Sequence, residues 1–368
     1  MKNLKILIIR NGKVSGAPNC LPKRLRVLEW HRYPSNCLPS NFDSDKLVIC
    51  KLPNSYFTSF GFLGSSKVIL KNIIILFLFI LFLFIFSLFS LQKFENLTDL
   101  NFDNCQLLTR IPDVSDLPNL EKLSFEGCKS LIAVDDSIGF LNKLKILKAQ
   151  RCTKLRRFPP LNLPSLEKLE LSYCYSLENF PEILGKTGNI KKLRLVRLLM
   201  IKELPVPFQN LTGLRYLEMT GCYFLRLKSN ILTSALTHFR VFRCKEWKWI
   251  NSKDGEEEMS STVSSKLRSF GVVYCDLNDD IFSAGFTQLT TVTSLDLSGT
   301  NITFLPECIK EFHHLNDLGV SFCKYLKEIR GIPPNLRKFR AKDCRSLTSS
   351  SSSMLLNQVF VLFLMNLI

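Results

Sequence analysis

The sequence predicts an α/β solenoid, an architecture in which one short unit is stacked many times along an axis. Two observations predict it. A similar phrase, opened by an aliphatic residue, occurs fourteen times, and most successive openings lie 21 to 25 residues apart. Within the phrase, apolar residues recur at the third and fifth positions after the opening, with polar residues between them. A fixed period of this length indicates stacked repeats rather than one globular core. The opening residues are Leu4, Leu25, Leu47, Leu97, Leu120, Leu144, Leu166, Ile190, Leu214, Leu236, Leu267, Val292, Leu315 and Leu336.

Each repeat is expected to start with a short strand. Counting offsets from the opening residue, Leu123 and Phe125 occupy offsets 3 and 5 of the repeat opened by Leu120. Alternation of this kind predicts a strand with one buried face. One such strand cannot bury its apolar side alone, so neighbouring repeats must stack their strands in parallel. We therefore expect a leucine-rich repeat horseshoe with a parallel β-sheet on its concave face.

The cysteines follow the same period. Leucine-rich repeats carry Asn or Cys where the chain turns out of the strand, and a buried thiol is a small apolar group with a weak S–H donor. We interpret these thiols as reduced structural groups that hydrogen-bond nearby backbone. The competing interpretation is disulfides, but the total of thirteen is odd and no secretory leader precedes the repeats. Reduced thiols favour a cytoplasmic location. Nine cysteines lie at offset 8: Cys105, Cys128, Cys152, Cys174, Cys222, Cys244, Cys275, Cys323 and Cys344.

One long apolar segment interrupts the repeats, because Leu47 and Leu97 are fifty residues apart. Residues 73–91 carry no charge and are long enough to span a bilayer. A transmembrane helix and a retained intron are both open, since removal of residues 68–92 restores a spacing of twenty-five. In either case the helix must loop out of the solenoid, or the first three repeats must be detached from the rest.

We accordingly divide the chain into four parts. Residues 1–67 hold the first repeats, 68–92 the apolar insert, 93–347 the main solenoid, and 348–368 a Ser-rich linker with an apolar tail. A membrane is expected as a partner only if residues 73–91 form a genuine span.

The composition argues against catalysis and against nucleic acid. The formal net charge is +17, which directs attention to acidic partners. Lysine and arginine are nevertheless spread through all repeats, without the interleaved aromatic residues of a nucleic-acid groove. Residues 184–187, LGKT, lack the earlier glycine of a phosphate-binding loop. Because the repeat explains the cysteines, and no C-x-x-C spacing occurs, we expect no catalytic residues, no metal site and no cofactor.

Recognition is expected on the face that the strands expose. Residues at offsets 2, 4 and 6 point away from the core, and this face is acidic near Asp99 and Asp103 and basic at 192–240 and 338–342. Aromatic residues and arginine make the best anchors for a protein partner. The candidate partner-binding residues are Lys192, Arg194, Tyr216, Glu218, His238, Arg240, Phe242, Lys338 and Arg340.

Several phrases carry a more specific resemblance. They are MKNLKILIIR from Met1, LPKRLRVLEWHRYPSNCLPSNF from Leu21, CQLLTRIPD from Cys105 and CTKLRRFPP from Cys152. On these, residues 1–67 and 93–358 resemble the leucine-rich repeat region of plant Toll/interleukin-receptor-type, nucleotide-binding disease resistance proteins. The resemblance implies sensing of a pathogen effector or host target, or restraint of the receptor switch through its nucleotide-binding domain. The family's signalling, nucleotide-binding and jelly-roll domains have no counterpart in this sequence, so nucleotide switching and NAD hydrolysis are not expected of it.

Two other functions remain open at this point. A substrate-recognition subunit of a ubiquitin ligase can carry the same cysteine-type repeats, although an F-box segment would precede them. A membrane-anchored receptor-like protein would need a signal peptide, and asparagine rather than cysteine at offset 8. The favoured interpretation is a non-enzymatic recognition module of an immune receptor.

Overall fold

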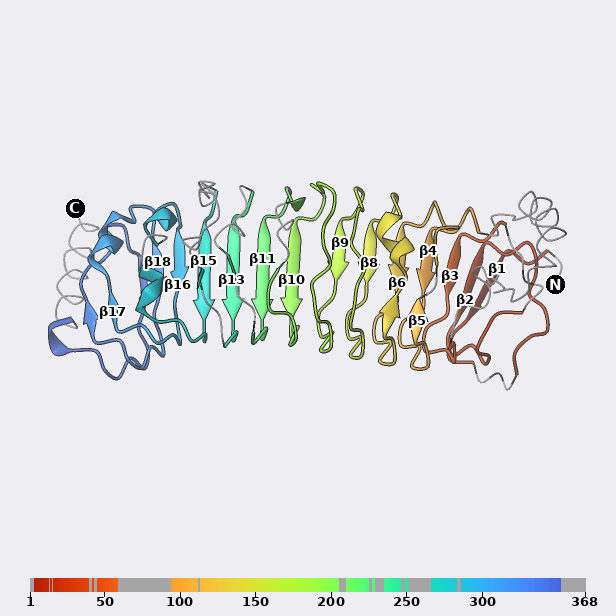
Figure 1. The fold of residues 1–368 in the computed structure, drawn as a ribbon, viewed down its shortest axis with the longest axis horizontal. Helices are drawn as coiled ribbons and strands as arrows, with labels where there is room; N and C mark the ends of the chain where they lie inside the picture. Colours follow the sequence, from red (N-terminus) through yellow and green to blue (C-terminus); the bar gives the residue numbers. More distant parts are fainter. Residues whose placement is uncertain are drawn as a thin grey trace, which may run out of the picture. The chain divides into compact units, whose positions relative to one another are not determined.

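The computed structural model describes residues 3–12, 14, 16–39, 42, 45–58, 94–111, 113–204, 210–224, 227–228, 235–245, 249–250, 266–282 and 286–351. The apolar insert at 68–92, its uncharged stretch 73–91 and the tail from residue 352 lie outside these ranges. The chain divides into two compact units, Met1–Leu177 (unit 1) and Glu178–Ile368 (unit 2), which Figure 1 colours from red to blue.

Unit 1 contains a seven-stranded parallel sheet with one strand from each repeat, side by side in sequence order. In register, Leu100 of one strand lies beside Leu123 of the next, so equivalent offsets are neighbours. A second, two-stranded sheet joins β5 (Arg110–Ile111) to β7 (Ala133–Val134), and a 3-10 helix, η1 (Asp136–Phe140), follows. The seven strands are β1 (Ile6–Ile9), β2 (Val27–Trp30), β3 (Ile49–Lys51), β4 (Asp99–Asn101), β6 (Lys122–Ser124), β8 (Ile146–Lys148) and β9 (Lys168–Glu170).

Unit 2 repeats this arrangement with a second seven-stranded parallel sheet. In each repeat, the return segment is the part of the chain that leads from the end of one main strand to the start of the next. In unit 2 these segments contain the short strand pairs β12 (Leu227–Lys228) with β14 (Trp249–Ile250) and β17 (Phe304–Leu305) with β19 (Glu328–Ile329). They also hold the 3-10 helices η4 (Asp279–Phe282), η5 (Phe286–Leu289) and η6 (Glu307–Glu311). The predicted solenoid of leucine-rich repeats with a parallel sheet is confirmed. The seven strands are β10 (Lys192–Val196), β11 (Tyr216–Thr220), β13 (His238–Phe242), β15 (Ser269–Val273), β16 (Ser294–Asp296), β18 (Asp317–Gly319) and β20 (Lys338–Arg340).

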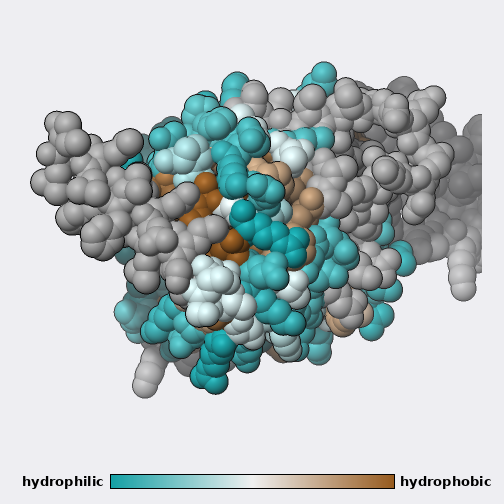
Figure 2. Space-filling view, turned by 90° about the vertical axis from the view of Figure 1, so that its left-hand side faces the viewer, coloured by the Kyte–Doolittle hydropathy of each residue, from teal (hydrophilic) through white to brown (hydrophobic). Residues whose placement is uncertain are grey.

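The core of each unit is built from the opening residues and offsets 3 and 5. Leu97, Leu100 and Phe102 of one repeat are fully buried, as are Leu120 and Leu123 of the next. Viewed from the C-terminal end in Figure 2, apolar residues lie in the middle and hydrophilic residues around them. Each additional repeat covers the apolar side chains of the one before it. Every Å² of apolar surface removed from water in this way stabilises the fold by about 25 cal/mol.

The repeats on either side of the apolar insert are paired directly. β3 and β4 are parallel neighbours, with Cys50 beside Leu100. The backbone N–H of Thr98 donates to the carbonyl of Val48 at 2.8 Å, and that of Leu52 to the carbonyl of Asn101 at 2.8 Å. The first three repeats are therefore not detached from the rest of unit 1.

A left-handed turn follows the strand in all fourteen repeats, and its residue is always at offset 7. In most repeats the backbone N–H at this position donates to the offset-6 carbonyl of the next repeat, for example from Tyr274 to Ser298 at 2.8 Å. Glycine and asparagine adopt positive φ readily, whereas bulky side chains do so at a cost. The residues are Asn11, Arg32, Asn54, Asn104, Gly127, Arg151, Tyr173, Arg197, Gly221, Arg243, Tyr274, Gly299, Phe322 and Asp343.

In the described ranges, no helix has the length and apolar character needed to cross a membrane. The prediction of a span rested on residues 73–91, which lie outside those ranges.

Candidate functional site: the open face of the sheet

All nine candidate binding residues lie in unit 2, on the side of the sheet that faces away from the core. We call this side, made of offsets 2, 4 and 6, the open face. Each of the nine side chains is exposed or half-buried. Strand register places Arg194 beside Glu218, and Glu218 beside Arg240. The sequence positions thus converge on one surface of β10, β11 and β13, with Lys338 and Arg340 on β20.

Glu218 is the centre of a polar cluster on this surface. Its Oε2 lies 2.9 Å from Nε of Arg194 and accepts a hydrogen bond from the hydroxyl of Tyr216 at 3.1 Å. Thr220 donates to its Oε1 at 3.4 Å. Burial, followed by the neighbouring Glu218 carboxylate, raises the pKa of Tyr216. The ammonium of Lys192 lies 4.6 Å from the centre of the Tyr216 ring, a cation–π distance. The cluster fixes the side chains of two strands.

Arg240 differs from Arg194 because, among the described residues, it has no carboxylate within ion-pair distance. Its guanidinium lies 5.8 Å from the centre of the Phe242 ring. On the same strand, Nδ1 of His238 lies 2.9 Å from the hydroxyl of Thr237, and its ring is 5.9 Å from that of Tyr216. Since no hydrogen bond to another described residue engages its guanidinium, Arg240 offers donors beside the Phe242 ring.

The C-terminal part of the open face contains small side chains and one dominant ion pair. Arg340 donates from Nη1 to Oδ1 of Asp317 at 2.5 Å, and its Nη2 lies 4.0 Å from Asp296. Gly319 makes this reach practicable, since a Cβ there would lie 2.7 Å from Oδ1 of Asp296 and 3.0 Å from Nη2 of Arg340. Arg340 is thus occupied within the sheet, whereas Lys338 on the same strand is exposed.

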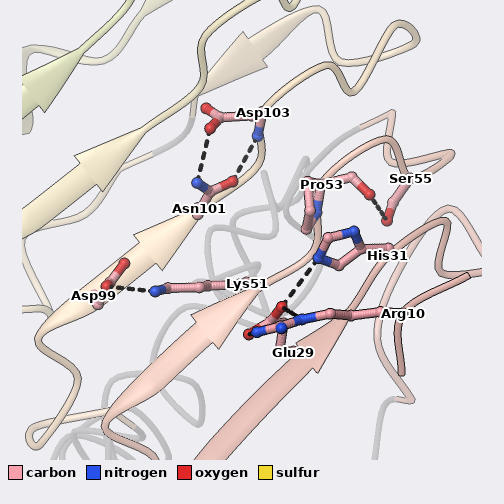
Figure 3. A network of polar contacts seen from close by, with 9 residues as sticks. All are labelled: Arg10, Glu29, His31, Lys51, Pro53, Ser55, Asp99, Asn101 and Asp103. Atoms are coloured by element: carbon pink, nitrogen blue, oxygen red, sulfur yellow. Dashed lines mark hydrogen bonds and ion pairs between the residues drawn. The ribbon is translucent and has the colours of Figure 1, made fainter. Parts of the chain in front are cut away.

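The N-terminal part of the open face of unit 1 carries paired polar side chains, as Figure 3 shows. Glu29 pairs with Arg10 and lies 3.0 Å from Nε2 of His31. The hydrogen bond from Arg10 is the main reason that the pKa of Glu29 falls to about 2. In the next pair, Lys51 lies 3.1 Å from Asp99. The carboxylates of Glu29 and Asp99 are therefore both engaged by a neighbouring cation.

The nine offset-8 cysteines are all free thiols. Each donates to the carbonyl at offset 5 of the preceding repeat, as Cys128 does to Phe102 at 3.1 Å and Cys174 to Ala149 at 3.1 Å. Eight are buried and Cys344 is half-buried. Burial raises the pKa of Cys174 to about 12, so this thiol is a poor nucleophile. The described residues contain no cluster of histidine, cysteine or carboxylate side chains that could hold a metal ion.

Five of the fourteen repeats lack the cysteine, and two of them, with Leu198 and Thr300 at offset 8, show different replacements. Thr300 donates to the carbonyl of Leu297 in its own repeat at 2.6 Å and lies 3.5 Å from the sulfur of Cys323. Leu198 fills the position with a buried apolar side chain that has no donor. The first substitution replaces the hydrogen bond, and the second loses it.

Comparison with known proteins now adds the family. The family profile described as disease resistance protein RPS4B-like, leucine-rich repeats, matches residues 162–359, which is more than half of the chain. The chain belongs to this family. Disease resistance protein RML1A of Arabidopsis thaliana is 26% identical over 356 residues, covering 94% of this chain and 27% of that protein. TMV resistance protein N of Nicotiana glutinosa is 26% identical over 395 residues, covering 94% and 32%.

This disease-resistance-type repeat chain spans roughly a quarter to a third of the length of those relatives. Among solved structures, YopM from Yersinia enterocolitica aligns over 92% of this chain and 73% of its own, with 17% identity and a TM-score of 0.42. That similarity adds nothing to the fold assignment, which rests on the strand pairing.

Sequence reasoning did not single out the offset-7 row, where unit 2 exposes large side chains. Exposed Arg243, Tyr274 and Phe322 stand there in unit 2. A signal was present, because asparagine and glycine at this offset in other repeats indicate a turn that does not favour large residues.

Proposed function

We propose that this chain is the recognition segment of a plant innate immune receptor and that it binds a protein through the open face of unit 2. The partner would be a pathogen effector or a host target. The observation that carries this proposal is the alignment of Lys192, Arg194, Tyr216 and Arg240 on three adjacent strands. Relatives that match 94% of the chain are disease resistance proteins, which supports the receptor context.

The chemistry of this surface suits a protein partner. Half-buried aromatic rings together with arginine are the side chains that dominate protein–protein interfaces. Arg240 retains free donors, while the Glu218 cluster holds its neighbours in place. The described residues assemble no nucleophile–base pair and no metal ligands, so the proposal includes no catalysed reaction. Repeats of this kind are known for interaction rather than chemistry.

The compartment and the remaining contacts are part of the same proposal. Free buried thiols support a reducing, cytoplasmic setting. A surface on the repeats would also contact the receptor's nucleotide-binding domain to restrain its switch. The four-part division of the chain, with residues 68–92 outside the repeats, completes the proposal. Transcript sequencing across codons 67–93 tests that division. Spliced messages that lack the codons for residues 68–92 would rule out the membrane model.

Affinity capture with matched variants tests the recognition surface. The tagged full chain, its Arg194→Glu/Arg240→Glu double variant and a Lys202→Glu control would be used on extracts of infected leaf, with quantitative mass spectrometry. Lys202 is exposed on the return segment. We expect at least one protein to be depleted tenfold or more by the double variant alone, and to bind the purified wild-type chain directly. An identical protein set for all three chains would refute the open face as the binding surface.

A further inference from the structure

Exposed apolar side chains in unit 2 are concentrated just beyond the strand ends. We call this region, at offsets 7, 9 and 10 of the repeats, the strand-end rim. Of seven large apolar residues exposed in the described part of unit 2, only Leu184 lies elsewhere. Single exposed apolar residues are ordinary, but a contiguous group marks an interaction surface. The six rim residues are Met200, Tyr223, Phe224, Tyr274, Phe322 and Tyr325.

Side chains from three repeats form a continuous row that joins this rim to Phe242 at the edge of the open face. The Tyr274 ring lies 5.7 Å from the Phe242 ring, edge to face, and 6.0 Å from the Phe322 ring. The guanidinium of Arg243 lies 5.2 Å from the centre of Phe242 and 5.8 Å from that of Tyr274. Gly299 lies beneath, where a Cβ would approach the Tyr274 ring to 2.4 Å. The row is therefore packed along itself and open only toward solvent.

The backbone under this row is unfavourable for the residues it carries. Arg243, Tyr274 and Phe322 have φ of 53°, 53° and 62°. Glycine occupies the same offset at Gly221 and Gly299, and satisfies the turn without strain. Tyr274 and Phe322 remain 40% and 38% exposed, so their rings do not repay the strain by filling the core. Strained positions that carry exposed rings are a reason to look for a binding role.

The charges around the row are mainly positive. Lys245 lies 5.9 Å from the Tyr223 ring, and Lys324 is exposed two repeats beyond Tyr274 and one beyond Gly299. Exposed Asp276 and Asp343 are fewer than the exposed cations of the same rim. Within the described ranges these cations form no ion pair. A partner with carboxylates would complement this charge. The rim cations are Arg197, Arg243, Lys245, Lys324 and Arg345.

We propose that the strand-end rim of unit 2 docks an acidic segment of a partner protein. The segment seats an apolar or aromatic side chain on the rings of Tyr274 and Phe322, and places carboxylates against Arg243 and Lys245. A protein fits better than single-stranded nucleic acid, because the rings contact one another and leave no gap for a base to enter. The rim lies outside the open-face cluster at Arg194, so this proposal does not depend on the proposed function.

Asparagine substitutions test the rim without disturbing the turn. Asn54 and Asn104 adopt the same backbone at offset 7, so Tyr274→Asn/Phe322→Asn removes both rings and keeps a residue that tolerates positive φ. The purified full chain is panned against a phage-displayed library of random twelve-residue peptides. Enriched peptides are synthesised, and their dissociation constants are measured by fluorescence anisotropy. Tyr173→Asn, the same change at the same offset in unit 1, is the matched control.

We expect the enriched peptides to carry net negative charge and an aromatic or aliphatic residue. Their affinity should fall at least tenfold in the double variant and in Arg243→Glu, and should be unchanged in Tyr173→Asn and Arg194→Glu. Thermal unfolding should show all variants folded. No enriched peptide, basic or neutral peptides, or affinities that the rim variants leave unchanged would overturn the proposal. Binding of a mixed-sequence single-stranded oligonucleotide that the same variants abolish would overturn it in favour of nucleic acid.

Discussion

The thiol of Cys105 donates a hydrogen bond to the carbonyl oxygen of Leu52, 3.3 Å away and fifty-three positions earlier in the chain. The same bond links Cys128 to Phe102 and Cys152 to Phe125, where the two partners belong to repeats that are adjacent in sequence. The repeat opened by Leu97 is therefore stacked on the repeat opened by Leu47 in the ordinary way. The fifty-residue spacing between Leu47 and Leu97 therefore does not separate these two repeats in the fold.

Deletion of residues 68–92 should leave unit 1 folded. The spacing between Leu47 and Leu97 halves from fifty to twenty-five, and halving a loop lowers its closure cost by about 0.6 kcal/mol. We expect equal or slightly higher stability in urea unfolding followed by circular dichroism. The deletion should also reduce aggregation, since it removes an uncharged apolar stretch. Loss of the cooperative transition would contradict the stacking.

The buried cysteine thiols at offset 8 should resist alkylation in the native protein. Cys20 and Cys37 are exposed, whereas Cys105 and Cys174 are buried and burial raises the pKa of each to about 12. The thiolate is the reactive form, so iodoacetamide at neutral pH should modify Cys20 and Cys37 first. Peptide mass mapping with and without urea measures this order. Rapid labelling of Cys105 in the absence of urea would show that this thiol is accessible in the native protein and not buried.

Acid should weaken the first repeats through Glu29. Its pKa in the folded chain falls to about 2, first because of the hydrogen bond from Arg10. A depressed carboxyl pKa contributes stability that is complete above the unfolded value near 4.5 and is lost as pH falls toward 2. Melting temperatures measured from pH 6 to pH 2 should therefore fall less steeply for Glu29→Gln than for the wild type. Parallel curves would mean that this pair contributes nothing.

Gly299 should be intolerant of a side chain as long as Tyr274 is present. A Cβ at Gly299 would lie 2.4 Å from the ring, and the backbone φ of 70° disfavours alanine in any case. Gly299→Ala should cost about 1–2 kcal/mol for the left-handed conformation, plus the displacement of the ring. A double-mutant cycle with Tyr274→Asn measures the second part. Strictly additive free energies would indicate that the ring does not lie on Gly299.

Much of this architecture can be predicted from the sequence. The spacing of the opening leucines identifies the repeat, alternation at offsets 3 and 5 places the strands, and offset 8 places the thiols. These features are local, because the same short phrase recurs and each copy needs the same neighbours. Exposure of Arg194 and Arg240 follows from the same alternation.

Whether an exposed charge is free could not be inferred in this way. Arg194 and Arg240 occupy the same offset in two repeats, yet Arg194 pairs with Glu218 and Arg240 pairs with no carboxylate in the described chain. Partners across parallel strands come from repeats about twenty residues away, so side-chain reach and register decide the outcome. The left-handed turn at Tyr274 and Phe322 likewise could not be predicted from those two residues, because tyrosine and phenylalanine disfavour a positive φ.

The sequence alone determined the period, the buried leucines and the direction in which each strand side chain points, because one repeat encodes its own pattern of apolar and polar groups. Only the tertiary structure decided that β3 pairs with β4 despite the residues between them, that Arg340 forms an ion pair with Asp317, and that Tyr274 lies over Gly299. Such contacts join different repeats, and their energies depend on distances that exist only once the repeats are stacked.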